Sequence, residues 1–173
     1  MNKIHARRLL ALCDLLETDR VKNHFNFRYW VVEDYAGAAN LSCGTLSCGT
    51  TACALGWATT IPALRDKRRV GLRLVRAACD GGLAEVVIAD GGKKPSPEQR
   101  YNNWRHAAHV AFGLNRNGQE VCFMPLESRD DEYTKLFPGD TIPNNYSTST
   151  DVAAHIRKFV AYATSKEGKA AGF

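Results

Sequence analysis

Apolar residues recur at helical spacing in the first part of the chain. His5, Leu9, Leu12, Cys13 and Leu16 fall on one face when successive residues turn by about 100°. This pattern predicts a helix over residues 3–18. Asn2 stands where its side-chain oxygen can cap the first backbone N–H groups. A lone histidine on an apolar face is usually a hydrogen-bonded core residue, which is how we interpret His5.

Two further stretches show the same periodicity with clear start or stop signals. Ser96-Pro97-Glu98 is typical of a helix start, and Gly113 of a helix end. The apolar face between them comprises Tyr101, Trp104, Ala107, Ala108, Ala111 and Phe112. The last helix is predicted from about residue 148 or 150 to Ser165, with Thr148 and Asp151 spaced as a capping box. A short helical turn is predicted at 118–124.

Alternation of apolar and polar residues predicts two strands, at 70–76 and 83–89. Asp80-Gly81-Gly82 lies between them and is typical of a hairpin turn. Together with about four main helices, this pattern predicts an α+β fold that is predominantly helical and has a small β-hairpin.

Length and composition narrow the class of protein. The 173 residues, 45% hydrophobic and 24% charged, suit a single globular domain, which we place at 1–167 with a frayed tail at 168–173. The net charge of +5 permits an anionic partner but is too small to point to nucleic acid. No apolar run is long enough to cross a membrane, and the N-terminus lacks a signal-peptide pattern. We therefore expect a cytoplasmic protein whose thiols stay reduced.

The segment 48–57 carries the strongest candidate chemistry. A helix is predicted to start near Thr50 or Thr51 and to run through Trp57 to about residue 60, with Pro62 ending it or starting another. Gly49 would let backbone N–H groups of the first turn approach a phosphate or carboxylate. Basic residues that follow, including Arg69 and Arg73, could complement the anion, and Trp57 could stack on it. The alternative is that the threonines only cap a helix, the arginines form a solvated face and Trp57 is a core anchor.

The cysteines of this segment suggest two other readings. Cys48 or Cys53 at a helix start could be a nucleophile with a lowered pKa, helped by a histidine base. The alternative for Cys53 is a small buried hydrophobic residue. The candidate bases are His5, His24, His106, His109 and His155, and His106 and His109 lie opposite the apolar face of their helix. Cys43, Cys48 and Cys53 could instead bind zinc, although their four-residue spacing is not typical of zinc sites, so we expect no metal and no cofactor.

The stretch Cys48-Gly49-Thr50-Thr51-Ala52-Cys53-Ala54-Leu55-Gly56-Trp57 resembles a motif of a known family. The pattern Cys-Gly-Thr-x-x-Cys-x-x-Gly followed by His or Trp is similar to one in uncharacterised small proteins of bacteria and bacteriophages. Matches around Phe25-Asn26-Phe27, Phe112-Gly113-Leu114 and Val152-Ala153-Ala154-His155-Ile156 extend the resemblance over most of the chain. The resemblance brings no activity or catalytic residue with it, and Trp57 stands where relatives have histidine. It implies an association with phages.

Three functions remain as hypotheses. The first is a module that binds a small anionic or nucleotide-like ligand at Gly49, Thr50 and Thr51, with Trp57, Arg69 and Arg73. The second is a protein–protein adaptor in host interaction or counter-defence. The third is a thiol-dependent hydrolase or transferase that uses Cys48, which we rank last.

Overall fold

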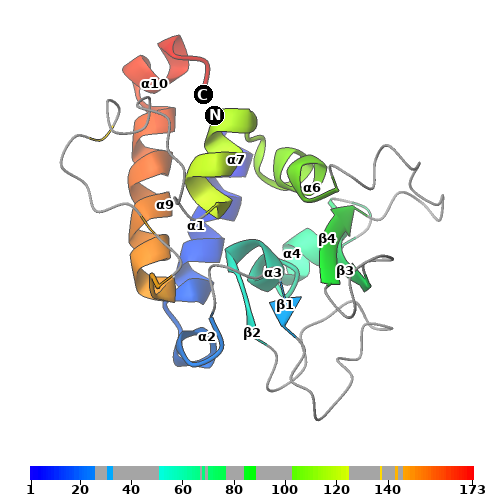
Figure 1. The fold of residues 1–173 in the computed structure, drawn as a ribbon. Helices are drawn as coiled ribbons and strands as arrows, with labels where there is room; N and C mark the ends of the chain where they lie inside the picture. Colours follow the sequence, from blue (N-terminus) through cyan, green and yellow to red (C-terminus); the bar gives the residue numbers. More distant parts are fainter. Residues whose placement is uncertain are drawn as a thin grey trace.

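A computed structural model describes residues 1–25, 31–32, 51–66, 68, 70–76, 84–88, 103–124, 137, 143 and 146–173 of the chain. The described fold is predominantly helical, as predicted (Figure 1). Its longer helices, labelled as in Figure 1, are α1 (Lys3–Leu16), α6 (Asn103–Phe112), α7 (Arg116–Phe123) and α9 (Ser149–Thr164). The short ones are α2 (Asp19–Lys22), α3 (Ala54–Ala58), α4 (Pro62–Arg65) and α10 (Lys166–Ala170).

Helices α1 and α9 lie side by side and form the longest helix pair of the fold (Figure 1). The predicted caps of both are confirmed: Asn2 accepts from the His5 amide, and Thr148 and Asp151 form a reciprocal capping box. Across the pair, Arg157 of α9 donates to Asp14 at 2.6 Å and to Glu17 at 2.9 Å. The guanidinium lowers the pKa of the Glu17 carboxyl through its hydrogen bond, so the contact links the two helices while Glu17 is ionised.

The chain turns between α6 and α7 within a few residues. Gly113 ends α6 with φ +64°, a conformation that favours glycine, and this predicted helix end is confirmed. Asn115 then caps α7 by accepting from the Gly118 amide at 2.9 Å. Helix α7 begins two residues earlier than the predicted turn at 118–124. The predicted start of α6 at Ser96-Pro97-Glu98 lies outside the described residues.

Strands contribute two small antiparallel pairs. Strand β1 (Val31–Val32) pairs with β2 (Thr51–Ala52), and β3 (Leu72–Arg76) pairs with β4 (Ala84–Ile88). The second pair coincides with the predicted strands and packs through β4 against α6. Residues 77–83 lie outside the described part, so the predicted Asp80-Gly81-Gly82 turn, and with it the hairpin, stays a prediction.

The C-terminal tail is not frayed, contrary to the prediction from Gly168 onward. Residues Lys166–Ala170 form α10, with Ser165 as its cap. Gly168 packs so closely on the Tyr162 carbonyl that a β-carbon there would overlap it. The Phe173 ring contacts Phe159 and Tyr162 edge to face, and the Phe173 carbonyl accepts from the N-terminal amine. These aromatic contacts hold the tail against α9, because they bury ring surface that fraying would expose.

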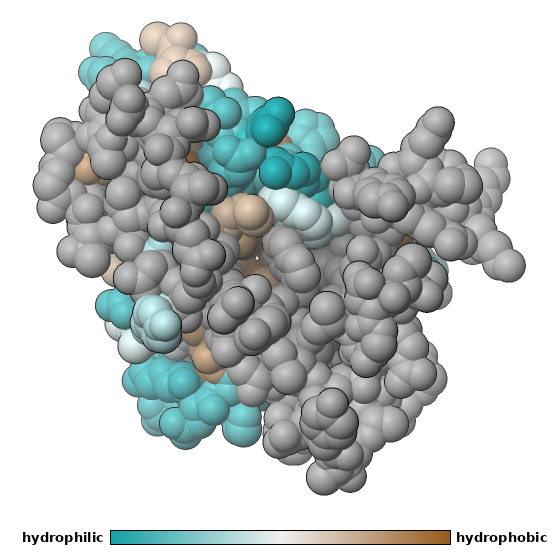
Figure 2. Space-filling view, in the orientation of Figure 1, coloured by the Kyte–Doolittle hydropathy of each residue, from teal (hydrophilic) through white to brown (hydrophobic). Residues whose placement is uncertain are grey.

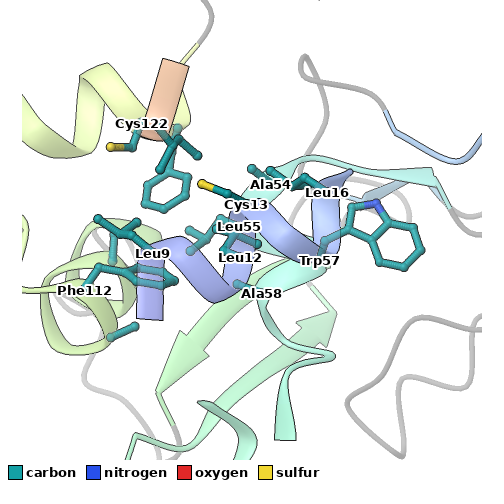
Figure 3. Close-up of a cluster of buried hydrophobic side chains, with 14 of the residues drawn as sticks. Leu9, Leu12, Cys13, Leu16, Ala54, Leu55, Trp57, Ala58, Phe112 and Cys122 are labelled. Atoms are coloured by element: carbon teal, nitrogen blue, oxygen red, sulfur yellow. The ribbon is translucent and has the colours of Figure 1, made fainter. Parts of the chain in front are cut away.

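The buried apolar residues of the described part form one cluster beneath α1, α3, α6, α7 and α9. Within it, Leu9 of α1 lies beside Phe112 of α6, Leu12 lies near Leu55 of α3, and Leu16 lies near Ala54 (Figure 3). Within the described ranges, no helix combines the length and the apolar composition needed to cross a bilayer.

Candidate functional site

The helix that was predicted to start near Thr50 or Thr51 begins later. Helix α3 starts at Ala54 with Cys53 as its N-cap, while Thr51 and Ala52 form strand β2. The Ala52 amide donates to the His24 carbonyl at 3.0 Å. Backbone groups that were predicted to lie in the first turn of a helix therefore form hydrogen bonds between strands instead. The local sequence does not show pairing with residues far away in the chain.

The start of α3 does not face solvent. Ala54, Leu55 and Gly56 are buried, and α3 has only five residues. An anion therefore cannot reach the amides of its first turn from the described surface. Cys48, Gly49 and Thr50 lie outside the described residues, so their predicted role stays a prediction.

Trp57 lies at the edge of the apolar cluster, on the side away from Phe112 and Cys122 (Figure 3). Only 3% of the residue is exposed, and its indole Nε1 donates to the His24 carbonyl at 3.3 Å. The Arg20 guanidinium lies 5.8 Å from the ring centroid. These contacts fit the core-anchor alternative, because the ring has little surface left on which a ligand could stack.

Of the two arginines assigned to the predicted site, the structure describes Arg73. It is half-buried on β3, and its Nε is buried without a hydrogen-bond partner among the described residues. Arg69 lies outside the described part, while the neighbouring Arg65 and Arg68 are exposed. Of the predicted site, the structure thus describes Thr51 in strand β2, Trp57 in the core and Arg73 on β3.

The described thiols are poorly suited to nucleophilic chemistry. Cys13, Cys53 and Cys122 are free and buried. Burial raises the pKa of Cys13 to about 12 and that of Cys53 to about 11, and it raises the pKa of Cys122 well above the usual range. At neutral pH these thiols stay protonated, and the thiolate is the reactive form. In the described part of the chain, no cluster of three metal-ligating side chains occurs either.

We expect Cys13, Cys53 and Cys122 to react slowly with iodoacetamide in the folded protein at pH 8, and rapidly once the protein is unfolded in urea. The physical reason is the same burial that raises the pKa values of these thiols. Peptide mapping by mass spectrometry measures each cysteine separately. Fast labelling of Cys53 in the native state would contradict its buried position.

A different basic surface is found between α6 and α7. An open hollow of about 490 Å³ is lined by Arg105, His109, Leu114, Asn115, Arg116 and Gln119. Strongly hydrophilic residues gather over α7 in the space-filling view (Figure 2). A volume of this order suits a small ligand, although the open shape leaves part of any ligand in water.

One carboxylate lies between the two arginines of the hollow. Glu120 Oε1 accepts from Arg105 Nη1 at 3.2 Å and from Arg116 Nε at 3.1 Å. A single negative charge therefore faces two guanidinium charges, and each guanidinium keeps further N–H donors for another acceptor. The Arg105 guanidinium also stacks over the Trp104 ring with its centre 4.5 Å from the ring centroid, which restrains its position.

The Leu114 carbonyl joins two side chains that line the hollow. Gln119 Nε2 donates to it at 2.9 Å, and His109 Nδ1 lies 3.1 Å from it. A carbonyl oxygen can only accept, so His109 Nδ1 must carry a proton. Gln119 Nε2 also donates to the Arg105 carbonyl at 3.1 Å, which ties the start of α6 to α7.

Positive charge continues from the hollow onto α1. The His5 ring packs against Gly113, and Arg8 Nη1 donates to the Ala111 carbonyl at 2.9 Å. Burial lowers the pKa of His5, and the charges of Arg8, His109 and the N-terminal amine lower it further. His5 was predicted to be a core residue, but it is only half-buried and lies at the border of the core.

Sequence reasoning found the exposed position of His109 but missed its neighbours. His106 and His109 are both exposed, as predicted. Arg105 and His109 are four residues apart and so share one helix face, which was a visible signal. Arg116 and Gln119 lie beside these two residues because the chain turns at Gly113. No local sequence pattern indicates the direction of that turn.

Comparison of the chain with protein-family models, curated proteins and solved structures gives no match. The resemblance of segment 48–57 to small bacterial and phage proteins therefore stays a prediction.

Proposed function

We propose that this protein binds a small anionic ligand in the hollow between α6 and α7. The observation that carries the proposal is the convergence of Arg105 and Arg116 on a single carboxylate, Glu120, at the edge of an open hollow. This keeps the ligand class predicted from the sequence and moves the site from segment 48–51 to residues 105–119.

The arginine geometry supports an oxyanion rather than a neutral ligand. A guanidinium presents several N–H groups in a fixed plane, and carboxylate or phosphate oxygens match that plane. Arg105 has 28% of its side chain exposed, so its donors are partly shielded from water, while Arg116 is 81% exposed and can move to meet a ligand. Because screening by solvent weakens exposed contacts, we expect modest affinity.

The test is an NMR titration of the protein with inorganic phosphate, pyrophosphate and AMP. Saturable shifts are expected for the amides of residues 105–119. Arg116→Gln is expected to lower the affinity for the anion that binds most tightly by about fivefold to tenfold, because it removes a charged hydrogen-bond donor. Arg116 is mostly exposed, so the variant should fold normally.

Arg7→Gln is the matched control, since Arg7 is an exposed arginine of α1 that does not line the hollow. It changes net charge equally and should leave the affinity within about twofold of the original. Equal weakening by both variants would mean that only overall charge matters. Absence of saturable binding by all three anions would exclude the proposal and favour the adaptor hypothesis.

We place this binding function in the cytoplasm of a bacterial or phage-infected cell. The support is that Cys13, Cys53 and Cys122 are free thiols, which is the usual state of cysteine in reducing compartments. Acid quenching of the natively expressed protein, followed by mass spectrometry, would report whether these cysteines are thiols. Disulfides at these cysteines, within one chain or between chains, would contradict the placement in the cytoplasm.

A further inference from the structure

The tautomer of His109 limits what the hollow can hold, and this inference rests on the proposed function. We propose that the ligand is a doubly charged oxyanion, such as a phosphoryl or sulfate group, and that His109 takes up a proton when it binds. Once Nδ1 of His109 is bonded to the Leu114 carbonyl, Nε2 is the ring nitrogen that remains available to a ligand.

In neutral His109 the single ring proton is on Nδ1, because Nδ1 lies 3.1 Å from the Leu114 carbonyl. The other ring nitrogen, Nε2, then carries a lone pair. A lone pair repels the oxygen of an anion, whereas an Nε2–H group would donate to it. Protonation of His109 therefore converts a group that opposes oxyanion binding into one that supports it, without breaking the bond to Leu114.

The charged groups around His109 also favour proton uptake when an anion binds. The charged groups beside the hollow are Arg105 of α6 and Arg116 and Glu120 of α7. From α1, the His5 ring packs on Gly113 and Arg8 donates to the Ala111 carbonyl, while the N-terminal amine is bonded to Phe173. All except Glu120 are cationic or become so on protonation. An anion that occupies the hollow would therefore favour a proton, and so a positive charge, on His109.

The net charge of the side chains at the hollow indicates the charge of the ligand. With His109 neutral, Arg105 and Arg116 exceed Glu120 by one positive charge. With His109 protonated, the excess is two, which matches a dianion such as sulfate or the doubly ionised phosphoryl group. Binding of a dianion and proton uptake then stabilise each other, as thermodynamic linkage requires.

Sulfate is the appropriate probe, since it stays doubly charged between pH 5.5 and 7.5 whereas phosphate titrates. Because protonated His109 favours binding, we expect the affinity for sulfate to fall about tenfold between pH 5.5 and pH 7.5. Isothermal calorimetry at constant ionic strength, repeated in two buffers with different ionisation enthalpies, measures the affinity and the protons taken up.

His109→Gln should bind sulfate weakly and with little change between the two pH values. The matched control is His106→Gln, because His106 is an exposed histidine of the same helix and does not line the hollow. It should keep the tenfold pH dependence. Independently of any variant, saturating sulfate should move the NMR titration midpoint of the His109 ring to higher pH.

The outcomes separate this inference from the proposed function. Binding of sulfate with equal affinity at both pH values, or an unchanged pH dependence in His109→Gln, overturns the role of His109 and leaves anion binding intact. An unmoved His109 midpoint under saturating sulfate also overturns it. If neither sulfate at pH 5.5 nor phosphate at pH 7.5 binds, both the proposed function and this inference are wrong.

Discussion

Replacing Phe112 with alanine is expected to lower the free energy of unfolding by about 3–5 kcal/mol. Phe112 is fully buried at the end of α6 and packs on Phe123 with ring centroids 5.5 Å apart. It lies beside Leu9 of α1 (Figure 3). Alanine would lose the buried ring surface and leave a cavity where three helices meet. Because small domains are stable by only about 5–15 kcal/mol, urea unfolding should show a large shift of the midpoint.

Two further variants make the Phe112 measurement specific. Phe112→Leu fills most of the volume and should cost about 1 kcal/mol. Ile4→Ala removes a large apolar side chain from α1, but Ile4 is 61% exposed, so the change should stay within about 0.5 kcal/mol. If Phe112→Ala cost no more than Ile4→Ala, Phe112 could not be a core residue.

Gly113→Ala is expected to lower the free energy of unfolding by about 2–4 kcal/mol, from two separate causes. The positive φ of +64° costs about 1–2 kcal/mol for a residue with a side chain. In addition, the new β-carbon would overlap the His5 ring, so α1 or the imidazole must move. Urea unfolding measures the sum of the two costs.

A double-mutant cycle and a second glycine separate the two costs. In a His5→Ala background, Gly113→Ala should cost only the backbone part, about 1–2 kcal/mol. Gly172 also has a positive φ, of +86°, but a β-carbon there would meet nothing within 4 Å. Gly172→Ala should therefore show no steric cost. Equal costs of Gly113→Ala in both backgrounds would rule out the contact between His5 and Gly113.

Local patterns predicted those features that depend on residues within one or two turns. The apolar face of α1, its Asn2 cap and the capping box of α9 follow from spacing and side-chain chemistry alone. Gly113 as a helix end and Pro62 as the first residue of α4 belong to the same group. In each case the stabilising contact is made by near neighbours in sequence.

Predictions failed where a distant segment supplied the partner. The helix expected at Thr51 begins at Ala54, because Thr51 and Ala52 pair with β1 and the Ala52 amide donates to the His24 carbonyl. The tail beyond Gly168 packs on α9 through Phe173, although its position at the chain terminus predicted fraying. Apart from Trp57, Thr51 and Arg73, the predicted site residues lie outside the described part, so their role stays a prediction.

The sequence by itself determined the predominantly helical character, the helix caps and the exposed position of His109, since these depend on periodicity and on neighbouring side chains. Only the tertiary structure decided that Arg105, His109, Arg116 and Gln119 line one hollow and that Trp57 is buried. Such features depend on the angle at which the chain turns after α6 and on packing between segments many residues apart. A local pattern carries no information about either, because many chain paths satisfy the same spacing.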